Sequence, residues 1–326
     1  MDKDYNEEIT DTTGLYNNLT VYAKLREWNS VTVLDKTENE VKTEKAENDE
    51  YVLPSYSENG VIGYDVEGKL YKAGDTIPVL GNITIKEVWL NIVMENGAYI
   101  RLSDNEGYYG GLRFKVTADS ETITKYADKI KIFGMVVPTE QISGDFDGVD
   151  ENPAIKELTE YSTKDGLNVY YITLTNVLYT NYNRAVSARG YAEIAYENGA
   201  DKVYTLYSKD NNSRSVYELA CMVANVVAEE ESAILAEYLS YTVNLVKDGN
   251  TYSVATTQDN FPTGFERKYT FVDGVLTLFD IPERLVEVLK TRPYVPVTVY
   301  DGDTCERILV NVELNGTTAT ANLVIE

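Results

Sequence analysis

The sequence contains no histidine and has only two cysteines among its 326 residues. The absence of histidine excludes Ser-His and Cys-His nucleophile pairs, zinc sites with histidine ligands and acid–base catalysis by imidazole. Two cysteines, Cys221 and Cys305, are too few for a disulfide-dense scaffold. Cys221 lies among apolar residues of a predicted helix, which favours an inert buried thiol. The scarcity of cysteine is compatible with a secreted bacterial protein.

Basic residues are also scarce, because 29 Lys and Arg face 53 Asp and Glu and leave a formal net charge of -24. Such a field repels nucleic acid and anionic lipid, so we expect neither as a partner. Acidity of this kind favours solubility outside a cell. No apolar run approaches the ~20 residues that span a bilayer, so we expect no membrane insertion. No signal peptide is evident after Met1, so we expect a fragment of a longer chain.

The most abundant signal is the alternation of tyrosine and β-branched residues, which is typical of strands. It is strongest over residues 168–207, where three alternating runs occur and Glu197-Asn198-Gly199 supplies a hairpin turn. We expect three neighbouring antiparallel strands here, at the centre of the largest domain. The charged stretch 36–50 is almost free of apolar residues and predicts a solvated hairpin tip or linker.

One long helix interrupts this pattern. Ser215 and Glu218 form a capping box, and apolar residues then recur at helical spacing, so the sequence predicts a helix over 215–243. Further strands follow, with strong hairpin turns at Asp273-Gly274 and Asn315-Gly316, and a short helix within 282–290.

Two parts of the chain resemble known families. The motifs Gly63-Tyr64-Asp65, GKLYKAGD from Gly68 and NITI from Asn82, with Trp89, are similar to the Listeria–Bacteroides repeat, a small β-grasp-like unit of bacterial surface proteins, over residues ~14–90. A tyrosine, Tyr64, stands where that repeat usually has tryptophan. The ordered motifs GAYIRL, GGLRFKV, MVVPTE, ARGYAEI and SRSVYELA resemble an uncharacterised β-sandwich domain of secreted Firmicutes proteins, over ~94–220.

We therefore expect a mainly β protein in four segments. Residues 1–28 would end a preceding repeat, 29–92 would form a β-grasp-like repeat, 93–245 would form a β-sandwich with one packed helix, and 246–326 would form a smaller β-rich C-terminal domain.

The 27 tyrosines suggest a ligand surface as well as a core. A tyrosine offers a flat apolar face with a polar tip, which suits the C–H face and hydroxyl rim of a sugar ring. The same residues also fill strand faces for structural reasons. The candidates for an exposed glycan platform are the tyrosines in predicted loops: Tyr108, Tyr109, Tyr179 and Tyr182.

An acidic loop at 144–152 is a candidate calcium site. Calcium takes six to eight oxygen ligands from carboxylates and carbonyls, and the loop offers a glycine and four acids: Asp145, Asp147, Asp150 and Glu151. The loop is not an EF-hand, because Lys156 stands where the final glutamate would be. In so acidic a chain, a solvated loop is the alternative. No other cofactor is indicated.

Two further features remain open. Four arginines in the strand motifs would either pair with carboxylates to fix strand register or line a pocket for an acidic ligand: Arg101, Arg113, Arg189 and Arg214. A Lys–Asn isopeptide crosslink at Asn322 is also conceivable, and it requires an apolar core in which a lysine loses its proton.

Taken together, the sequence predicts a non-catalytic, extracellular module of a Gram-positive cell-surface protein with an adhesion or scaffold role. Its partner would be a host or environmental glycan or another surface protein. The alternative is a glycan-active enzyme of the glycoside hydrolase kind, or its accessory carbohydrate-binding module. Hydrolysis would need two carboxylates facing each other across a cleft, and no pair stands out.

Overall fold

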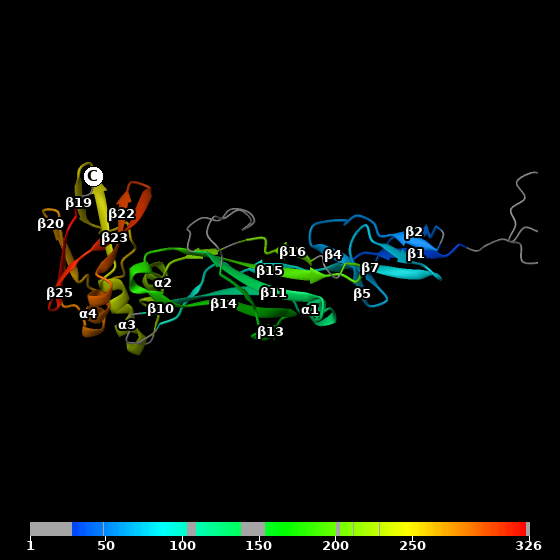
Figure 1. The fold of residues 1–326 in the computed structure, drawn as a ribbon, viewed down its shortest axis with the longest axis horizontal. Coiled ribbons are helices and arrows are strands. Elements are labelled where there is room, and N and C mark those ends of the chain that lie inside the picture. The colour runs from blue at the N-terminus through cyan, green and yellow to red at the C-terminus, as the bar shows by residue number, and fades with distance from the viewer. Residues whose placement is uncertain are drawn as a thin grey trace, which may run out of the picture. The chain divides into compact units, whose positions relative to one another are not determined.

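The computed structural model describes residues 28–47, 49–102, 109–137, 154–199, 203–210, 212–227 and 229–323. Strands dominate, arranged in several sheets with a few short helices, which confirms the prediction of a mainly β protein (Figure 1). The chain divides into two compact units. Unit 1 is Met1–Trp89 with Tyr196–Asn198, and unit 2 is Leu90–Ala195 with Gly199–Glu326. None of the described helices is long and apolar enough to cross a membrane.

Unit 1 is built on a five-stranded sheet of order β2-β1-β7-β4-β5. The strands are β1 (Ser30–Leu34), β2 (Glu40–Lys45), β4 (Val61–Val66), β5 (Lys69–Tyr71) and β7 (Ile83–Trp89). A second, two-stranded sheet pairs β3 (Glu50–Val52) with β6 (Thr76–Pro78). The first and last strands, β1 and β7, are parallel neighbours inside the sheet, while its other pairs are antiparallel.

The core of unit 1 follows from alternation along β1, where Val31 and Val33 point inward. They pack in one cluster with Tyr64 and Ile85. The charged stretch 36–50, predicted as a solvated hairpin tip or linker, forms the tip of the β1–β2 hairpin and then strand β2, whose side chains are nearly all exposed. A charged strand at the edge of a sheet is a common protection against pairing with another chain. The hairpin alternative is therefore the one that agrees with the structure, and the charge continues along an edge strand.

The first half of unit 2 is a sandwich of two sheets. One sheet has the order β13-β14-β10-β8, with β9 also on β10, and its strands are β8 (Ile92–Met94), β9 (Tyr99–Ile100), β10 (Tyr109–Asp119), β13 (Ser162–Lys164) and β14 (Leu167–Leu178). The other has the order β12-β11-β15-β16, with β17 also on β15, and its strands are β11 (Ile130–Val137), β12 (Ala154–Glu157), β15 (Val186–Ala195), β16 (Val203–Tyr207) and β17 (Asn212–Arg214). A short helix, α1 (Ser120–Lys125), follows β10.

Two glycines let these sheets meet. Gly134 on β11 and Gly190 on β15 are paired directly across their strands. A Cβ atom at Gly134 would lie 2.5 Å from Cγ1 of Ile172 on β14, and one at Gly190 would lie 2.8 Å from Cγ1 of Val116 on β10. Since Ile172 and Val116 belong to the facing sheet, their side chains occupy the space over this glycine pair and leave no room for a Cβ atom there.

The three strands expected within 168–207 do not share one sheet. β15 and β16 form the predicted hairpin, but β14 pairs with β10 and β13 in the facing sheet. The short 3₁₀ helix η1 (Tyr179–Asn181) begins the crossing from one sheet to the other. Alternation identifies a strand with a buried face, and both facing sheets of a sandwich impose the same alternation.

The helix predicted over 215–243 is two helices, α2 (Val216–Val223) and α3 (Glu229–Ser240). The serine cap of the predicted capping box is confirmed, because Ser215 Oγ accepts a hydrogen bond from the backbone N–H of Glu218 at 3.1 Å. The first helix ends at Val223 and the second begins at Glu229, so the apolar spacing is not carried by one continuous helix.

The rest of unit 2 contains two four-stranded sheets. The first has the order β19-β18-β22-β23 and contains β18 (Val243–Asp248), β19 (Thr251–Val254), β22 (Tyr294–Asp301) and β23 (Thr304–Asn311). The second has the order β20-β21-β25-β24 and contains β20 (Tyr269–Val272), β21 (Val275–Leu278), β24 (Glu313–Asn315) and β25 (Thr318–Asn322). The turns at Asp273-Gly274 and Asn315-Gly316 join hairpins as expected. The expected boundary at 245/246 falls inside β18.

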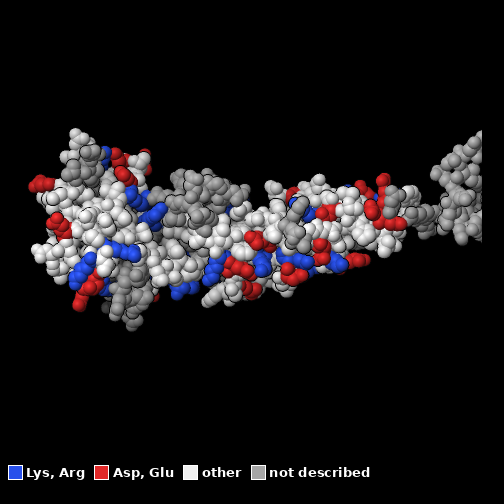
Figure 2. Space-filling model, in the orientation of Figure 1, with Lys and Arg blue, Asp and Glu red and all other residues white. Residues whose placement is uncertain are grey.

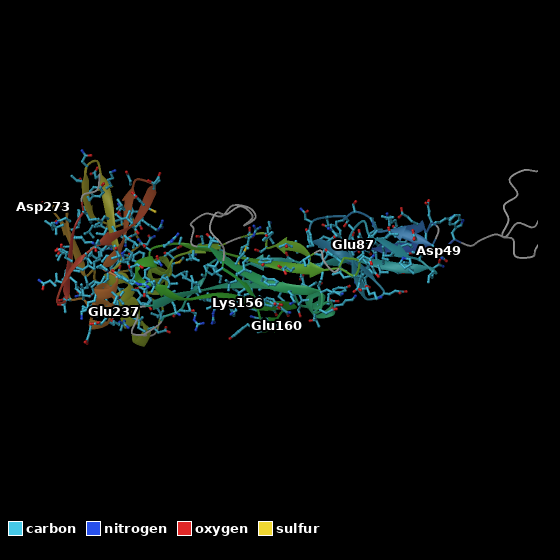
Figure 3. The ribbon with its side chains drawn as sticks, in the orientation of Figure 1. Asp49, Glu87, Lys156, Glu160, Glu237 and Asp273 are labelled. Atoms are coloured by element: carbon cyan, nitrogen blue, oxygen red, sulfur yellow. The ribbon has the colours of Figure 1, made fainter. Side chains whose placement is uncertain are left out.

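Helix α4 (Glu283–Thr291) covers part of the predicted short helix and is joined to α3 by an ion pair. Glu237 on α3, labelled in Figure 3, accepts a hydrogen bond from Nε of Arg284 on α4 at 2.6 Å. The pair is partly buried, so its geometry fixes how the two helices meet within unit 2.

The glycine pair leads to a stability prediction. Gly190→Ala forces a methyl group against Val116, and we expect it to destabilise unit 2 by about 1–3 kcal/mol, the usual cost of overpacking a core. Chemical denaturation followed by circular dichroism measures the change.

The control and the rescue use the same chain. Gly81→Ala meets no atom within 4 Å and should change stability by less than about 0.5 kcal/mol. Adding Val116→Ala to Gly190→Ala removes the clashing methyls, so the double variant should be more stable than the sum of the single changes predicts, by about 0.5–3 kcal/mol. A Gly190→Ala protein as stable as the parent would contradict the close approach of the sheets.

Candidate functional site

Two of the four predicted platform tyrosines lie in the core. Tyr179 and Tyr182 are both fully buried, and their rings meet edge to face with centroids 5.7 Å apart. The Tyr179 hydroxyl donates a hydrogen bond to the carbonyl of Tyr241 at 2.6 Å. In a 3₁₀ turn, side chains three residues apart lie on the same side, so η1 directs both rings inward together. The prediction that they form an exposed glycan platform is therefore wrong.

The other predicted residues are not placed as a site. Tyr108 and the calcium candidates Asp145, Asp147, Asp150 and Glu151 lie outside the described residues. Tyr109 begins β10, where its backbone pairs with Leu178. Within the part of the chain that the structure describes, no group of three or more acidic or cysteine side chains is arranged to hold a metal ion.

The arginines of the strand motifs make contacts within unit 2. Arg189 is buried and donates from Nε and Nη2 to the carbonyl of Ser208, at 3.1 and 2.8 Å, with its guanidinium over the Tyr207 ring. Arg113 lies over the Tyr171 ring, and Arg214 lies 3.7 Å from Glu218 one helical turn on. Arg101 is exposed. Arg189 and Arg113 therefore contact aromatic rings or backbone carbonyls, where carboxylates were expected. These contacts favour a role of the arginines in stabilising the strands over a pocket for an acidic ligand.

The isopeptide hypothesis does not fit Asn322. Its side chain is exposed at the end of β25. A crosslink of this kind requires an apolar surrounding that removes the proton from a lysine, and an exposed position does not provide it.

Unit 2 contains a polar pocket of about 320 Å³ that the sequence did not predict. We call it the polar pocket. It joins the residues after η1, the start of α2, the loop after β19, and strands β22 and β23. Its lining comprises Asn183, Ala185, Ser215, Tyr217, Glu218, Cys221, Met222, Gln258, Asp259, Asn260, Thr298, Tyr300 and Arg307.

The floor of the polar pocket is a buried hydrogen-bond network of an amide, a hydroxyl and a guanidinium. Asn183 and Thr298 are 5% and 2% exposed, and Asn183 Nδ2 donates to Thr298 Oγ1 at 3.0 Å. Arg307 donates from Nε to the carbonyl of Asn183 at 2.5 Å. Burial lowers the pKa of the Arg307 guanidinium, because desolvation disfavours its charge. These bonds hold β22 and β23 against the residues that follow η1.

One wall contains a buried ion pair. The Asp259 carboxylate accepts two hydrogen bonds from Arg267, at 2.8 and 3.0 Å, and a third from the Tyr217 hydroxyl at 3.0 Å. Burial raises the pKa of Tyr217 far above its usual range, so this hydroxyl remains a donor. The ring of Phe261 covers the Arg267 guanidinium at 3.9 Å. Removing either charge would leave the other buried without its partner, which typically costs about 3–5 kcal/mol.

The polar pocket offers mainly hydrogen-bonding groups. Its lining contains two carboxylates, Glu218 and Asp259, and both oxygens of Asp259 already accept hydrogen bonds from Arg267. The two-carboxylate mechanism of glycoside hydrolysis needs both acids available to the substrate. Amides and hydroxyls make up most of the remaining polar lining, and these groups both donate and accept hydrogen bonds.

The surface of the chain is mixed in charge on one face. Figure 2 shows acidic and basic side chains interspersed on the face in view, with neutral residues between them. Ion pairs occur among the charged residues of unit 2, such as Nζ of Lys115 with Oε1 of Glu95 at 2.6 Å.

The comparisons with known proteins identify no relative. The chain matches no family model, and it matches no curated protein. The interpretation of the polar pocket therefore depends on its geometry alone.

Cys221 in the polar pocket allows a test of burial. Burial raises the pKa of its thiol to about 12, so at pH 8 only about one molecule in ten thousand has the reactive thiolate. We expect iodoacetamide to alkylate the exposed Cys305 and to leave Cys221 unmodified in the native protein, with Cys221 labelling increasing as the pH approaches 12. Peptide mass spectrometry reads out both positions.

Unfolded protein is the internal control, since both thiols should then react at similar rates. Equal labelling of the two cysteines in the native state at pH 8 would contradict the placement of Cys221 in the wall.

Proposed function

We propose that this chain is a non-catalytic scaffold module of a Gram-positive cell-surface protein, working outside the cell and carrying tension along its length. The observation that carries the proposal is the parallel pairing of β1 with β7, the strands through which the chain enters and leaves the sheet of unit 1. Adhesion to another surface protein or to a glycan would place such a module under load.

The geometry of that pair decides how it responds to force. Val31 pairs with Ile83 and Leu34 with Lys86, so the two strands run in the same direction side by side. The chain enters at the start of β1 and leaves at the end of β7, which lie at opposite ends of a parallel pair. Tension therefore slides one strand along the other and loads all their hydrogen bonds together. β2 and β4 flank the pair, so neither strand is an edge that can peel away.

Other features of the chain support a scaffold role over an exposed recognition platform. The tyrosines expected to form a platform, Tyr179 and Tyr182, are core residues. The net charge of -24 and the scarcity of cysteine suit an extracellular protein. The resemblance of residues ~14–90 to repeats of bacterial surface proteins agrees with this role. The ion pair that occupies Asp259 disfavours the alternative of a glycan-active enzyme.

Single-molecule force measurement tests the proposal on the whole chain. The two native cysteines are first replaced by Cys221→Ala and Cys305→Ser, so that they do not react with the handles. The handles are then attached through Trp28→Cys and Asn91→Cys, two exposed positions just outside β1 and β7. We expect unit 1 to resist a high rupture force, because unfolding under load is governed by a rate and shear requires several bonds to break at once.

The matched control pulls the same sheet from Trp28→Cys and Glu47→Cys, which flank the open end of the antiparallel β1–β2 hairpin. That geometry breaks the hydrogen bonds one after another, so its rupture force should be clearly lower. Equal rupture forces in the two geometries would refute a tension-bearing role for the β1–β7 pair.

A further inference from the structure

The polar pocket has a size and position that the scaffold role does not explain. Its volume of about 320 Å³ lies within the range of small-molecule sites in proteins. Five chain segments converge on it, and several of its polar side chains are almost completely buried, among them Asn183 and Thr298. Burying polar groups costs free energy unless they have partners, and Asn183 and Thr298 are partners of each other, so the floor presents a ligand with polar groups already held in place.

The groups around the pocket suit a ligand that both donates and accepts hydrogen bonds. The carboxamides of Asn183, Gln258 and Asn260 offer donors and acceptors, and the hydroxyls of Ser215 and Thr298 can serve as either. A sugar ring displays hydroxyl groups with the same dual character around its rim. Gln258 and Asn260 are exposed at the rim, where a ligand would reach them first.

The pocket also has apolar surface for the face of a ring. The side chain of Tyr300 is partly exposed on β22, and Met222 is 64% exposed on α2. Aromatic rings bury a flat apolar partner well while their polar edges stay hydrogen-bonded. Burial raises the pKa of Tyr300 far above its usual range, so its hydroxyl is also available as a donor at neutral pH.

The charges favour a neutral ligand over an anionic one. Asp259 and Arg267 neutralise each other within the wall, and the remaining charged groups of the lining, Glu218 and Arg307, are opposite in sign. Glu218 stands exposed in the lining and would repel a phosphate or carboxylate. The net charge of -24 on the whole chain also repels anionic ligands.

From these observations we infer that the polar pocket binds a neutral sugar unit, with Tyr300 and Met222 against the ring and Gln258, Asn183 and Thr298 at its hydroxyls. The pocket lies entirely in unit 2, so this inference does not rest on the tension-bearing role of unit 1.

The four methionines of the chain provide a direct readout. With the methionine methyl groups ¹³C-labelled, the full-length protein is titrated with glucose, galactose, mannose and N-acetylglucosamine. We expect at least one of these sugars to shift the Met222 methyl resonance in a saturable way. Met94 and Met135, which are 3% and 5% exposed and do not line the pocket, should not move and are internal references.

Variants locate the site. Tyr300→Ala should weaken binding about tenfold, and Gln258→Ala should weaken it by about two- to tenfold. Tyr294→Ala is the matched control, because Tyr294 lies on the same strand, is 43% exposed and does not line the pocket. It should leave the affinity unchanged. Gln258 is an exposed loop residue, so its variant reports on binding even if Tyr300→Ala impairs folding.

Three outcomes would overturn the inference: no saturable shift of Met222 with any of the four sugars, an affinity that Tyr300→Ala and Gln258→Ala leave unchanged, or displacement of the sugar by inorganic phosphate, which would assign an anion site. Incubation with the disaccharides cellobiose and lactose tests the non-catalytic role separately from sugar binding. Release of single sugars would contradict a non-catalytic role, whereas intact disaccharide with a shifted Met222 supports both proposals.

Discussion

The sandwich of unit 2 depends on the absence of two side chains. Facing sheets usually lie about 10 Å apart, with side chains from both filling the space between them. Opposite Gly134 and Gly190 that space is filled from one side only, by Ile172 and Val116. The glycines are paired with each other on neighbouring strands, so the close approach extends across two strands at the centre of the sheet. The strands involved, β10, β11, β14 and β15, are the long ones of the sandwich, and their relative position is set at this point.

Tyrosine has a different role from the one its abundance suggested. Several rings fill the cores of the two units while their hydroxyls donate to backbone carbonyls that no strand partner satisfies, as Tyr179 does to Tyr241, Tyr64 to Ser55 and Tyr196 to Ile62. Burial raises the pKa of Tyr64 to about 12, so that hydroxyl remains protonated at neutral pH. Each such tyrosine combines apolar packing with a bond to a loop or bulge, and a buried carbonyl left without it would be costly.

Features of the fold that depend on a few neighbouring residues were predicted correctly from the sequence. The serine cap at Ser215 and the turn at Asp273-Gly274 are each decided by a few neighbouring residues, and both occur as predicted. The sheet to which β14 belongs is decided by packing against β10, some fifty residues earlier, and alternation does not encode that choice. The polar pocket could not be predicted for the same reason. Asn183, Gln258 and Thr298 are ordinary residues in their own segments and become a site only where the folded chain brings them together.

The pocket lies where two parts of unit 2 meet. Asn183 and α2 belong to the end of the sandwich, while Thr298 and Tyr300 stand on β22, which runs parallel to β18 in the following sheet. A ligand held between them would bind only when both parts are folded and in place. By linkage, any ligand that binds the native state alone stabilises it in proportion to its occupancy. Sugar binding would therefore strengthen the junction between the sandwich and the C-terminal sheets, so that a module that carries load would become more resistant to unfolding when it is engaged with its ligand.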